Sequence, residues 1–340
     1  MTHHGSNYGQ FPYQVPPPGA PQPPVIPFWP LDLGRLFSGS FAAVKQNAGP
    51  MFKISLGASA VIGLISGASA AAFASFSIDP DFWFEVDTEV TFDSAWSAIG
   101  GTAAEVAASL IAALLMLFVS AILVLSAVNS VIGSNLSVSS LWGKLAPNGW
   151  RLIGAALLVW LIVGLGGALA IFGVMALMVL FIVVTDTVIW PWVILMTLAV
   201  LGGITLIIWG SVRLYFSTSV VAVEGAGPVE ALRRSWRLTK GAFWRVFGRY
   251  LLVSILAGTI LSLVIGIVSA IMVALTALAG VPAAFSTFLI AFFSSLLAGV
   301  VLPYTSSYSA LMYTDERIRK ENLAPALAEA FLENSQRASQ

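Results

Sequence analysis

The side chains in this sequence that could bind a ligand are basic residues gathered between positions 228 and 249. They include Arg233, Arg234, Arg237, Lys240 and Arg245. Guanidinium and ammonium groups pair with phosphate oxygens, and basic residues beside a membrane attract anionic lipids. The cluster therefore predicts a site for anionic lipid headgroups. The alternative is that these charges only set the direction of insertion. A nucleic-acid partner is not expected, because the cluster is one loop beside lipid.

The spacing of residues 228–240 predicts a short helix that lies in the plane of the membrane interface. Pro228 suits the first position of a helix. Val229, Leu232 and Trp236 recur at helical spacing and share one face, whereas basic side chains occupy much of the remainder. Such a helix buries its apolar face at the boundary of the acyl chains and leaves its charges beside the phosphates.

Several kinds of chemistry are excluded by what the sequence lacks. The chain has no Cys, and its two His stand at positions 3 and 4, so thiol and histidine catalysis in the membrane are excluded. No charged residue falls at the middle of an apolar stretch, where proton relays and ion paths carry one. We therefore expect no enzymatic activity, no cofactor and no metal. For the acidic segment 77–102, an alternative to a solvated loop is that its carboxylates bind a hard cation such as Ca²⁺.

The composition places these residues in a membrane protein. The chain of 340 residues is 58% hydrophobic and 9% charged, which leaves too little polar surface to cover a globule in water. Six apolar stretches are each long enough to cross the hydrocarbon core. They run over about 53–76, 103–128, 152–184, 192–216, 246–278 and 285–312. We expect an all-α fold, with a six-helix membrane domain over 31–314.

The third stretch is too long for a straight crossing. A helix over 152–184 reaches about 50 Å, against about 30 Å for the hydrocarbon core. It must tilt, project into water or bend near Gly164, Gly166 and Gly167. The first polar break, at 185–187, ends it.

Two stripes of small residues indicate close helix packing. The first is Gly63 and Gly67, and the second is Gly258, Ser262, Gly266 and Ala270. Residues without bulky side chains let helix backbones approach one another. We expect this packing to occur mainly within one chain, with self-association as the alternative.

The distribution of charge predicts the orientation. All 16 Lys and Arg fall before or at the start of the first stretch, or in and beside the segments after the second, fourth and sixth. Cytoplasmic segments carry the excess of Lys and Arg, so both termini are expected in the cytoplasm. Residues 1–30 hold nine prolines and predict a disordered tail, and 315–340 predict a second, partly helical tail. No cleavable signal peptide is expected, so the first spanning helix directs insertion.

An aromatic–basic pair opens the third and fifth apolar stretches and recurs after 94 residues. The pairs are Trp150-Arg151 and Trp244-Arg245, with Phe52-Lys53 as a looser copy at the first stretch. A ring prefers the interface while the cation stays in water. The expected interface anchors are Phe52, Trp150, Trp236 and Trp244. The repeated unit would be a short interfacial helix followed by an outward helical hairpin, used three times with pseudo-threefold order.

Three segments carry a family resemblance. They are 33–50, the run Gly-Pro-Val-Glu-Ala-Leu-Arg-Arg-Ser-Trp-Arg-Leu at 227–238 with Lys240-Gly241 and Phe243-Trp244-Arg245 behind it, and the ending Tyr313-x-Asp315-x-Arg317-Ile318-Arg319-x-Glu321. They resemble the membrane domain associated with bacterial glycerophosphodiester phosphodiesterases, whose stand-alone relatives are common in actinobacteria. The resemblance brings no catalytic residues, since in the fused members a separate soluble domain performs hydrolysis. It implies a bacterial plasma-membrane protein that lacks this catalytic domain.

Two functions remain open on the sequence. The first is a non-catalytic scaffold or accessory protein linked to envelope or lipid processes, with anionic lipids and an unidentified membrane or envelope protein as partners. The second is a transporter or flippase-like protein for an apolar or amphipathic solute. A deep polar cavity between the helices would favour transport, and dense packing to the centre would favour a scaffold.

The orientation can be tested with single cysteines at Ser94 and Ser335 of this Cys-free chain. We expect only Ser94→Cys to react with a membrane-impermeant thiol reagent in intact cells, because residue 94 falls in an outer segment and residue 335 in the cytoplasmic tail. Lysed cells, in which both sites should react, are the control. Labelling at both positions in intact cells, or at residue 335 alone, contradicts the topology.

Overall fold

The computed structural model of the protein describes residues 26–27, 29–75, 92–134, 136–184 and 190–338. Its long helices are α2 (Ala48–Ser75), α3 (Phe92–Val131), α5 (Gly149–Val184), α6 (Trp190–Leu214), α9 (Phe243–Leu278) and α10 (Ala283–Glu321). The shorter ones are α1 (Leu33–Gln46), α4 (Val138–Leu145), α7 (Ser217–Glu224), α8 (Pro228–Thr239) and α11 (Ala324–Ala338), with the 3₁₀ turn η2 (Ala146–Asn148). Most of the proline-rich tail, residues 76–91 of the first outer segment and the break at 185–187 lie outside the described residues.

The prediction of an all-α protein with six spanning helices is confirmed. Six helices in the described part of the chain are long and apolar enough to cross a membrane, and no strand occurs there. Helix α5 is uninterrupted over Gly149–Val184, so its glycines do not break it. The close approach between α5 and α6 is at Gly203 of α6, where a Cβ would lie 2.5 Å from the Cβ of Ala170, whereas a Cβ on Gly167 would make ordinary contact with Ile207 at 3.4 Å.

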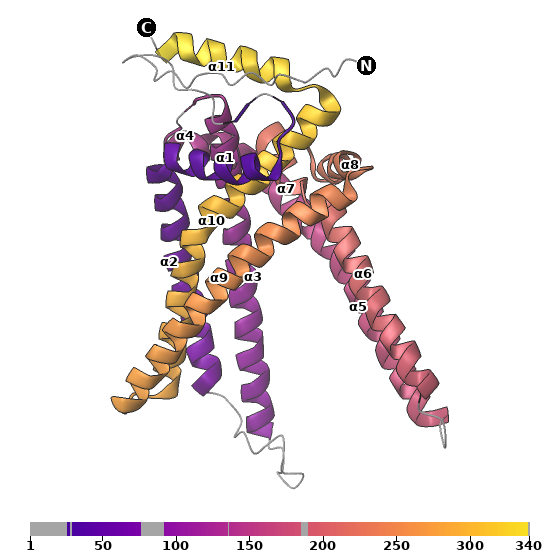
Figure 1. Cartoon of the computed structure of the whole chain (residues 1–340). Helices are drawn as coiled ribbons and strands as arrows, with labels where there is room; N and C mark the ends of the chain where they lie inside the picture. Colours follow the sequence, from indigo (N-terminus) through magenta and orange to yellow (C-terminus); the bar gives the residue numbers. More distant parts are fainter. Residues whose placement is uncertain (1–25, 28, 76–91, 135, 185–189, 339–340) are drawn as a thin grey trace, which may run out of the picture.

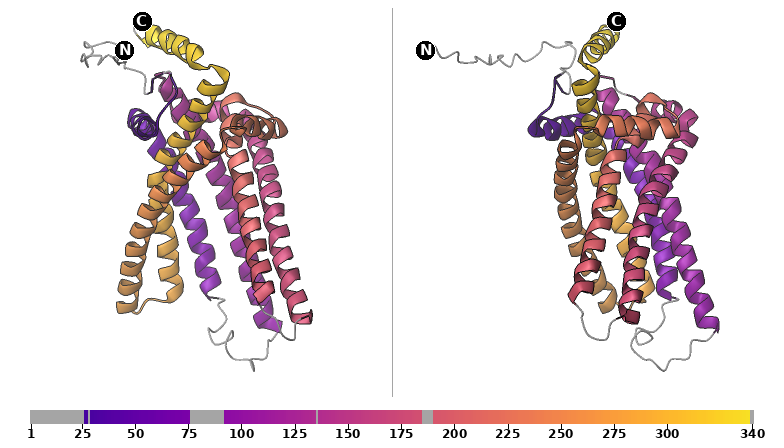
Figure 2. Two further views of the ribbon diagram at one scale, coloured as in Figure 1. Left: turned by 45° about the vertical axis from the view of Figure 1, so that its right-hand side comes forward. Right: turned by 90° about the vertical axis from the view of Figure 1, so that its right-hand side faces the viewer.

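The long helices converge at one end of the molecule and diverge toward the other (Figure 1). Helices α1, α4, α7 and α8 gather at the converging end, and α1 and α8 lie across the long helices there (Figures 1 and 2). Helix α11 lies at the same end. An even number of crossings returns the chain to the side on which it started, in agreement with this arrangement.

The packed core lies at the converging end. Its fully buried side chains include Leu36, Leu141, Leu152, Phe216, Leu238, Tyr308 and Tyr313. The diverging parts of the long helices instead expose aliphatic side chains, as at Leu161 on α5 and Leu206 on α6, which are 61% and 62% exposed. So large an apolar surface would cause aggregation in water, whereas lipid tails are as apolar as leucine and can cover it.

Helix α2 packs more extensively against α10 than against α3, its neighbour in the chain. A Cβ on Gly67 would lie 2.8 Å from the ring of Phe288 and 3.0 Å from the carbonyl oxygen of the same residue. Beside this contact, Ser295 Oγ donates a hydrogen bond to the carbonyl oxygen of Ser59 at 2.9 Å. The Gly63–Gly67 stripe is thus used for packing within the chain, as expected.

The three predicted interfacial helices correspond in position to α1, α4 and α8, which precede α2, α5 and α9. The packing of the long helices does not repeat in the same way. Helices α5 and α6 form a close pair, whereas α2 and α9 both pack on α10. The stripe on α9 is open, since a Cβ on Gly258 or Gly266 would meet no described atom within 4 Å. The threefold repeat therefore stays a prediction from the sequence.

Helix α10 continues through the position at which the C-terminal tail was expected to begin. It extends to Glu321, and Asp315 and Glu316 are buried within it. Residues 315–321 therefore belong to the packed converging end. The chain leaves α10 at Asn322, which adopts a left-handed conformation, and α11 follows.

Candidate functional site

Buried charges concentrate where α9 and α10 meet at the converging end. Asp315 is 0% exposed, and its carboxylate accepts hydrogen bonds from Arg249 Nη1 at 2.5 Å and from Arg319 Nε at 2.9 Å. It also accepts one from the backbone N–H of Leu31 at 2.7 Å. The carbonyl oxygen of Leu31 accepts from Nη2 of Arg249 at 2.9 Å and from Nη2 of Arg319 at 2.8 Å. Three charged side chains therefore hold both backbone polar groups of one residue.

The neighbouring carboxylate, Glu316, forms a second pair with α9. It accepts two hydrogen bonds from Arg245, from Nε at 2.8 Å and from Nη2 at 2.7 Å. This two-point geometry matches the planar guanidinium to the carboxylate and is among the stronger ion pairs in proteins. Arg249 Nη1 lies 4.0 Å from Glu316, so the two pairs adjoin.

A third group of charges joins α7, α8 and α10. Glu321 accepts hydrogen bonds from Arg234 Nη2 and Arg317 Nε, each at 3.0 Å. Arg234, Arg317 and the hydroxyl of Tyr313 contact Glu224 at the end of α7. Burial lowers the pKa of the Arg234 guanidinium, but the carboxylates of Glu224 and Glu321 raise it by more, so its pKa lies above the ordinary value.

We call these residues together the charged clamp. They are Glu224, Arg234, Arg245, Arg249, Tyr313, Asp315, Glu316, Arg317, Arg319 and Glu321. Moving an ion out of water costs several kcal/mol unless a partner compensates it, and every carboxylate of the clamp has one. The clamp joins four helices and residue 31, and its groups are satisfied by one another. The clamp therefore has a structural role, since it holds four helices together.

The structure separates the five basic residues that were predicted to bind lipid. Arg234 and Arg245 belong to the charged clamp. Arg233, Arg237 and Lys240 are exposed, and their side chains have no carboxylate partner among the described residues. These three lie together along one side of α8, and they form the part of the cluster that remains open to a phosphate.

The side chains of α8 fall on three faces of the helix, which differ in burial and in charge. One face is buried: Ser235 Oγ accepts the backbone N–H of Phe216 at 3.1 Å and donates to the carbonyl oxygen of Arg213 at 2.9 Å. The next face exposes Val229 and Trp236, as expected for contact with acyl chains. The third carries the free basic residues. The helix ends before Gly241, whose φ of 75° suits a residue without a side chain.

The predicted interface anchors differ in their surroundings. Trp150 and Trp244 are 64% and 77% exposed at the starts of α5 and α9, where rings at headgroup level would lie. Trp236 packs edge-to-face on Trp209, with ring centroids 5.0 Å apart. Phe52 is partly buried and lines a groove instead.

Arg213 stands at the end of α6 and lies against two tryptophan rings. Its guanidinium lies 5.1 Å from the ring centroid of Trp236 and 5.6 Å from that of Trp209. Its Nε and Nη1 atoms are buried without a hydrogen-bond partner in the described structure. Attraction to the two ring faces thus helps to fasten α8 to α6.

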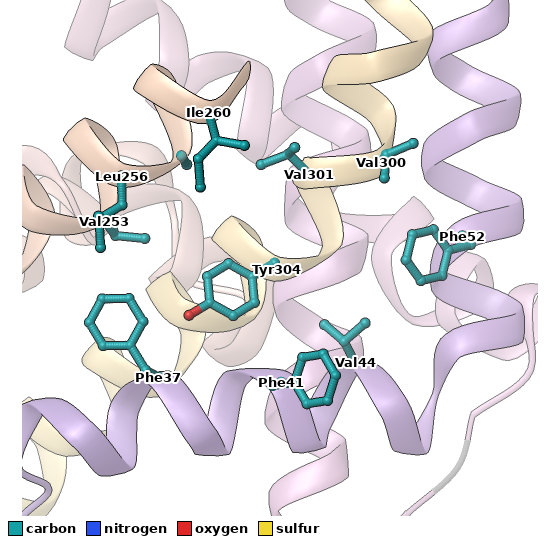
Figure 3. Close-up of a pocket in the computed structure, with 11 residues that line it drawn as sticks. Phe37, Phe41, Val44, Phe52, Val253, Leu256, Ile260, Val300, Val301 and Tyr304 are labelled. Carbon is teal, nitrogen blue, oxygen red and sulfur yellow. The ribbon is translucent and has the colours of Figure 1, made fainter. Parts of the chain in front are cut away.

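An apolar groove lies between α1, α2, α9 and α10, with a volume of about 470 Å³. Its lining includes Phe37, Phe41, Phe52, Leu256, Ile260 and Tyr304 (Figure 3). It could not be predicted from the sequence, because its lining comes from two pairs of consecutive helices, α1–α2 and α9–α10, that are far apart in the chain. It lacks the polar lining that was expected of a transport cavity.

Sequence reasoning missed the clamp because it assigned the basic residues of 228–249 to anionic lipid or to insertion. The structure shows Arg249 buried and paired with Asp315. A sequence signal did exist. Asp315 and Glu316 are adjacent carboxylates directly after a spanning stretch, at a depth where a carboxylate requires a cation.

These features define a polytopic helical membrane protein with its polar joint at one end. A family model matches residues 46–314, and the chain belongs to that family, a family of unknown function (DUF7544). No curated protein and no solved structure matches the chain significantly. The resemblance to the membrane domain associated with glycerophosphodiester phosphodiesterases stays a prediction.

The clamp predicts a large stability cost for losing Arg249. Arg249→Gln would leave Asp315 buried with one cation fewer, and breaking such a pair costs about 3–5 kcal/mol. The exposed Arg233→Gln should cost no more than about 0.5 kcal/mol. Thermal unfolding of each variant in mild detergent measures the difference. The double variant Arg249→Gln, Asp315→Asn removes the uncompensated charge and should recover part of the loss. Equal unfolding temperatures for the two single variants would show that the clamp does not hold the fold.

Proposed function

We propose that this protein is a non-catalytic scaffold or accessory protein of the bacterial plasma membrane. The observation that carries the proposal is the charged clamp. Its ionisable groups pair with one another and join helices, so they are not presented to a substrate. Outside it, the long helices offer exposed apolar surface to lipid or to another membrane protein. A protein with a fixed polar end and wide lateral surfaces is suited to hold partners in place.

The proposed ligand at the converging end is anionic lipid. Arg233, Arg237 and Lys240 are exposed on α8, and on the adjacent face Val229 and Trp236 are exposed to acyl chains. A helix with cations on one side and apolar side chains on the next is suited to the membrane interface. We infer that the converging end faces the cytoplasm, because the basic residues gather there.

A second candidate is transport or flipping of an apolar or amphipathic solute. The groove between α1, α2, α9 and α10 favours it, because the groove opens toward lipid and could admit such a molecule. The divergence of the long helices (Figure 2) agrees with either function. We prefer the scaffold, because an apolar groove offers no polar path across the membrane.

The lipid proposal predicts the effect of removing the three free charges. Replacing Arg233, Arg237 and Lys240 by Gln should reduce bound anionic lipid by up to about a hundredfold, because each charge contributes about 1 kcal/mol. Native mass spectrometry after gentle extraction measures the bound lipid. Arg233→Lys with Arg237→Lys keeps the charge and should retain the lipid. An unchanged lipid complement in the triple Gln variant would leave insertion as the role of these residues.

The two candidate functions differ in reconstituted vesicles. For a scaffold, we expect a fluorescent phospholipid to cross the bilayer no faster with the protein than without it. We also expect no release of glycerol phosphate from glycerophosphodiesters. Protein-free vesicles and vesicles with heat-denatured protein are the controls. Protein-dependent crossing would favour transport, and protein-dependent hydrolysis would overturn the non-catalytic assignment.

A further inference from the structure

The groove between α1, α2, α9 and α10 shares no residue with the lipid site on α8. It opens sideways, since Phe41, Ile260 and Val300 line it and are 65%, 61% and 50% exposed. Every side chain of the lining is hydrocarbon apart from one hydroxyl, that of Tyr304. Any occupant must therefore be almost wholly apolar.

The position of α1 sets the depth of the groove in the membrane. Phe37, Phe41 and Val44 extend from α1 toward the groove (Figure 3), while Arg35 and Lys45 of the same helix are exposed. A helix with apolar side chains on one side and cations on another lies at headgroup level. The groove directly beneath it then lies at the depth of the first part of the acyl chains.

Hydrocarbon must fill a groove at this depth. Water would find one hydroxyl there, fewer polar partners than an ordered water needs, and an empty groove would forfeit the dispersion contacts of its walls. The hydrophobic effect does not select the occupant, however, because the surrounding lipid tails are equally apolar. Preference for one lipid must come from polar contacts at the rim.

Three polar groups are available for such contacts. The Tyr304 hydroxyl makes no hydrogen bond to any residue that the structure describes, and it points toward α1, the headgroup side (Figure 3). Lys45 stands one helical turn after the lining residue Phe41 on α1, and Lys53 follows the lining residue Phe52 in the first turns of α2. Both are exposed and have no carboxylate partner in the described structure.

We infer that the groove binds one acyl chain of an anionic phospholipid from the leaflet at the converging end. The Tyr304 hydroxyl donates a hydrogen bond to the ester carbonyl of the lipid, and Lys45 and Lys53 lie beside its phosphate. The assignment goes beyond the lipid site on α8 and stands or falls separately from it.

The test uses the full chain reconstituted in phosphatidylcholine with a small fraction of phosphatidylglycerol that carries a photoactivatable diazirine in its acyl chain. After irradiation, mass spectrometry maps the labelled segments. Label should concentrate in 253–260 and 300–304, compared with the exposed segment 198–208 of α6. Removing the α8 charges should leave this pattern unchanged. Equal labelling of the groove and of α6 would overturn the inference.

A matched pair of variants separates groove binding from general contact with lipid. Ala257→Trp fills the groove and should lower its labelling to the level of α6, whereas Ala270→Trp, on the exposed surface of the same helix, should not. If Ala257→Trp labels like the original protein, the groove does not hold the chain. If labelling gives way in native membranes to cross-links with another protein, a partner helix occupies it instead.

The polar contacts are tested by variants that remove one polar group each and leave the apolar lining of the groove in place. Lys45→Gln and Lys53→Gln should each lower labelling by phosphatidylglycerol about fivefold, from the contribution of one cation beside an anionic lipid. Labelling by a diazirine phosphatidylcholine should stay the same. Tyr304→Phe should lower labelling by both lipids, because both have the ester carbonyl. Unchanged labelling in all three variants would refute the assignment even if Ala257→Trp failed to fold.

Discussion

The converging end of the molecule depends on pairing the carboxylates of Asp315 and Glu316 with cations where water does not reach them. Each is held by arginines of α9, and Asp315 also binds the backbone of residue 31. Losing one partner would leave a buried charge uncompensated. Helix α10 can therefore neither rotate nor slide against α9 without a large cost, and the N-terminal segment is fixed to the same point. The ion pairs set the register between α9 and α10, and the short helices pack against the two helices in this register.

The rest of the membrane domain has no comparable restraint. Association of helices in a bilayer gains little from the hydrophobic effect, so close packing must come from shape, as where α10 reaches the backbone of α2 at Gly67. Where small residues face lipid instead, as at Gly258 on α9, no described neighbour approaches. The molecule thus has a polar end, in which ion pairs fix the positions of the helices, and apolar parts whose surface is suited to lipid. The scaffold proposal rests on the fixed polar end, and the groove beneath α1 is part of the apolar surface beside it.

The spanning helices and α8 could be predicted from the sequence because they depend on local properties: apolar length, helical spacing and the position of charges. The clamp could not be predicted in the same way, since Arg249 and Asp315 are 66 residues apart and meet only after α9 and α10 have packed. The same limit applied to α8. Its spacing indicated an amphipathic helix, but only the packed structure shows that Arg234 turns toward Glu224 and Glu321 while Arg233 faces outward. For the long stretch that became α5, the sequence left tilt, projection into water and a bend open, because its length alone does not show how α6 packs beside it.

The α5–α6 pair is joined to the other elements mainly at the converging end and diverges from α9 and α10 along its length (Figures 1 and 2). Such a pair has the geometry of a lever whose pivot lies near α8. The 36 residues of α5 reach about 54 Å, so a rotation of about 5° at the pivot moves the far end by about 5 Å. A force on the far end of this arm would act on α8 as a torque. Mechanical stress in the membrane would therefore be transmitted to the helix that carries the free basic residues.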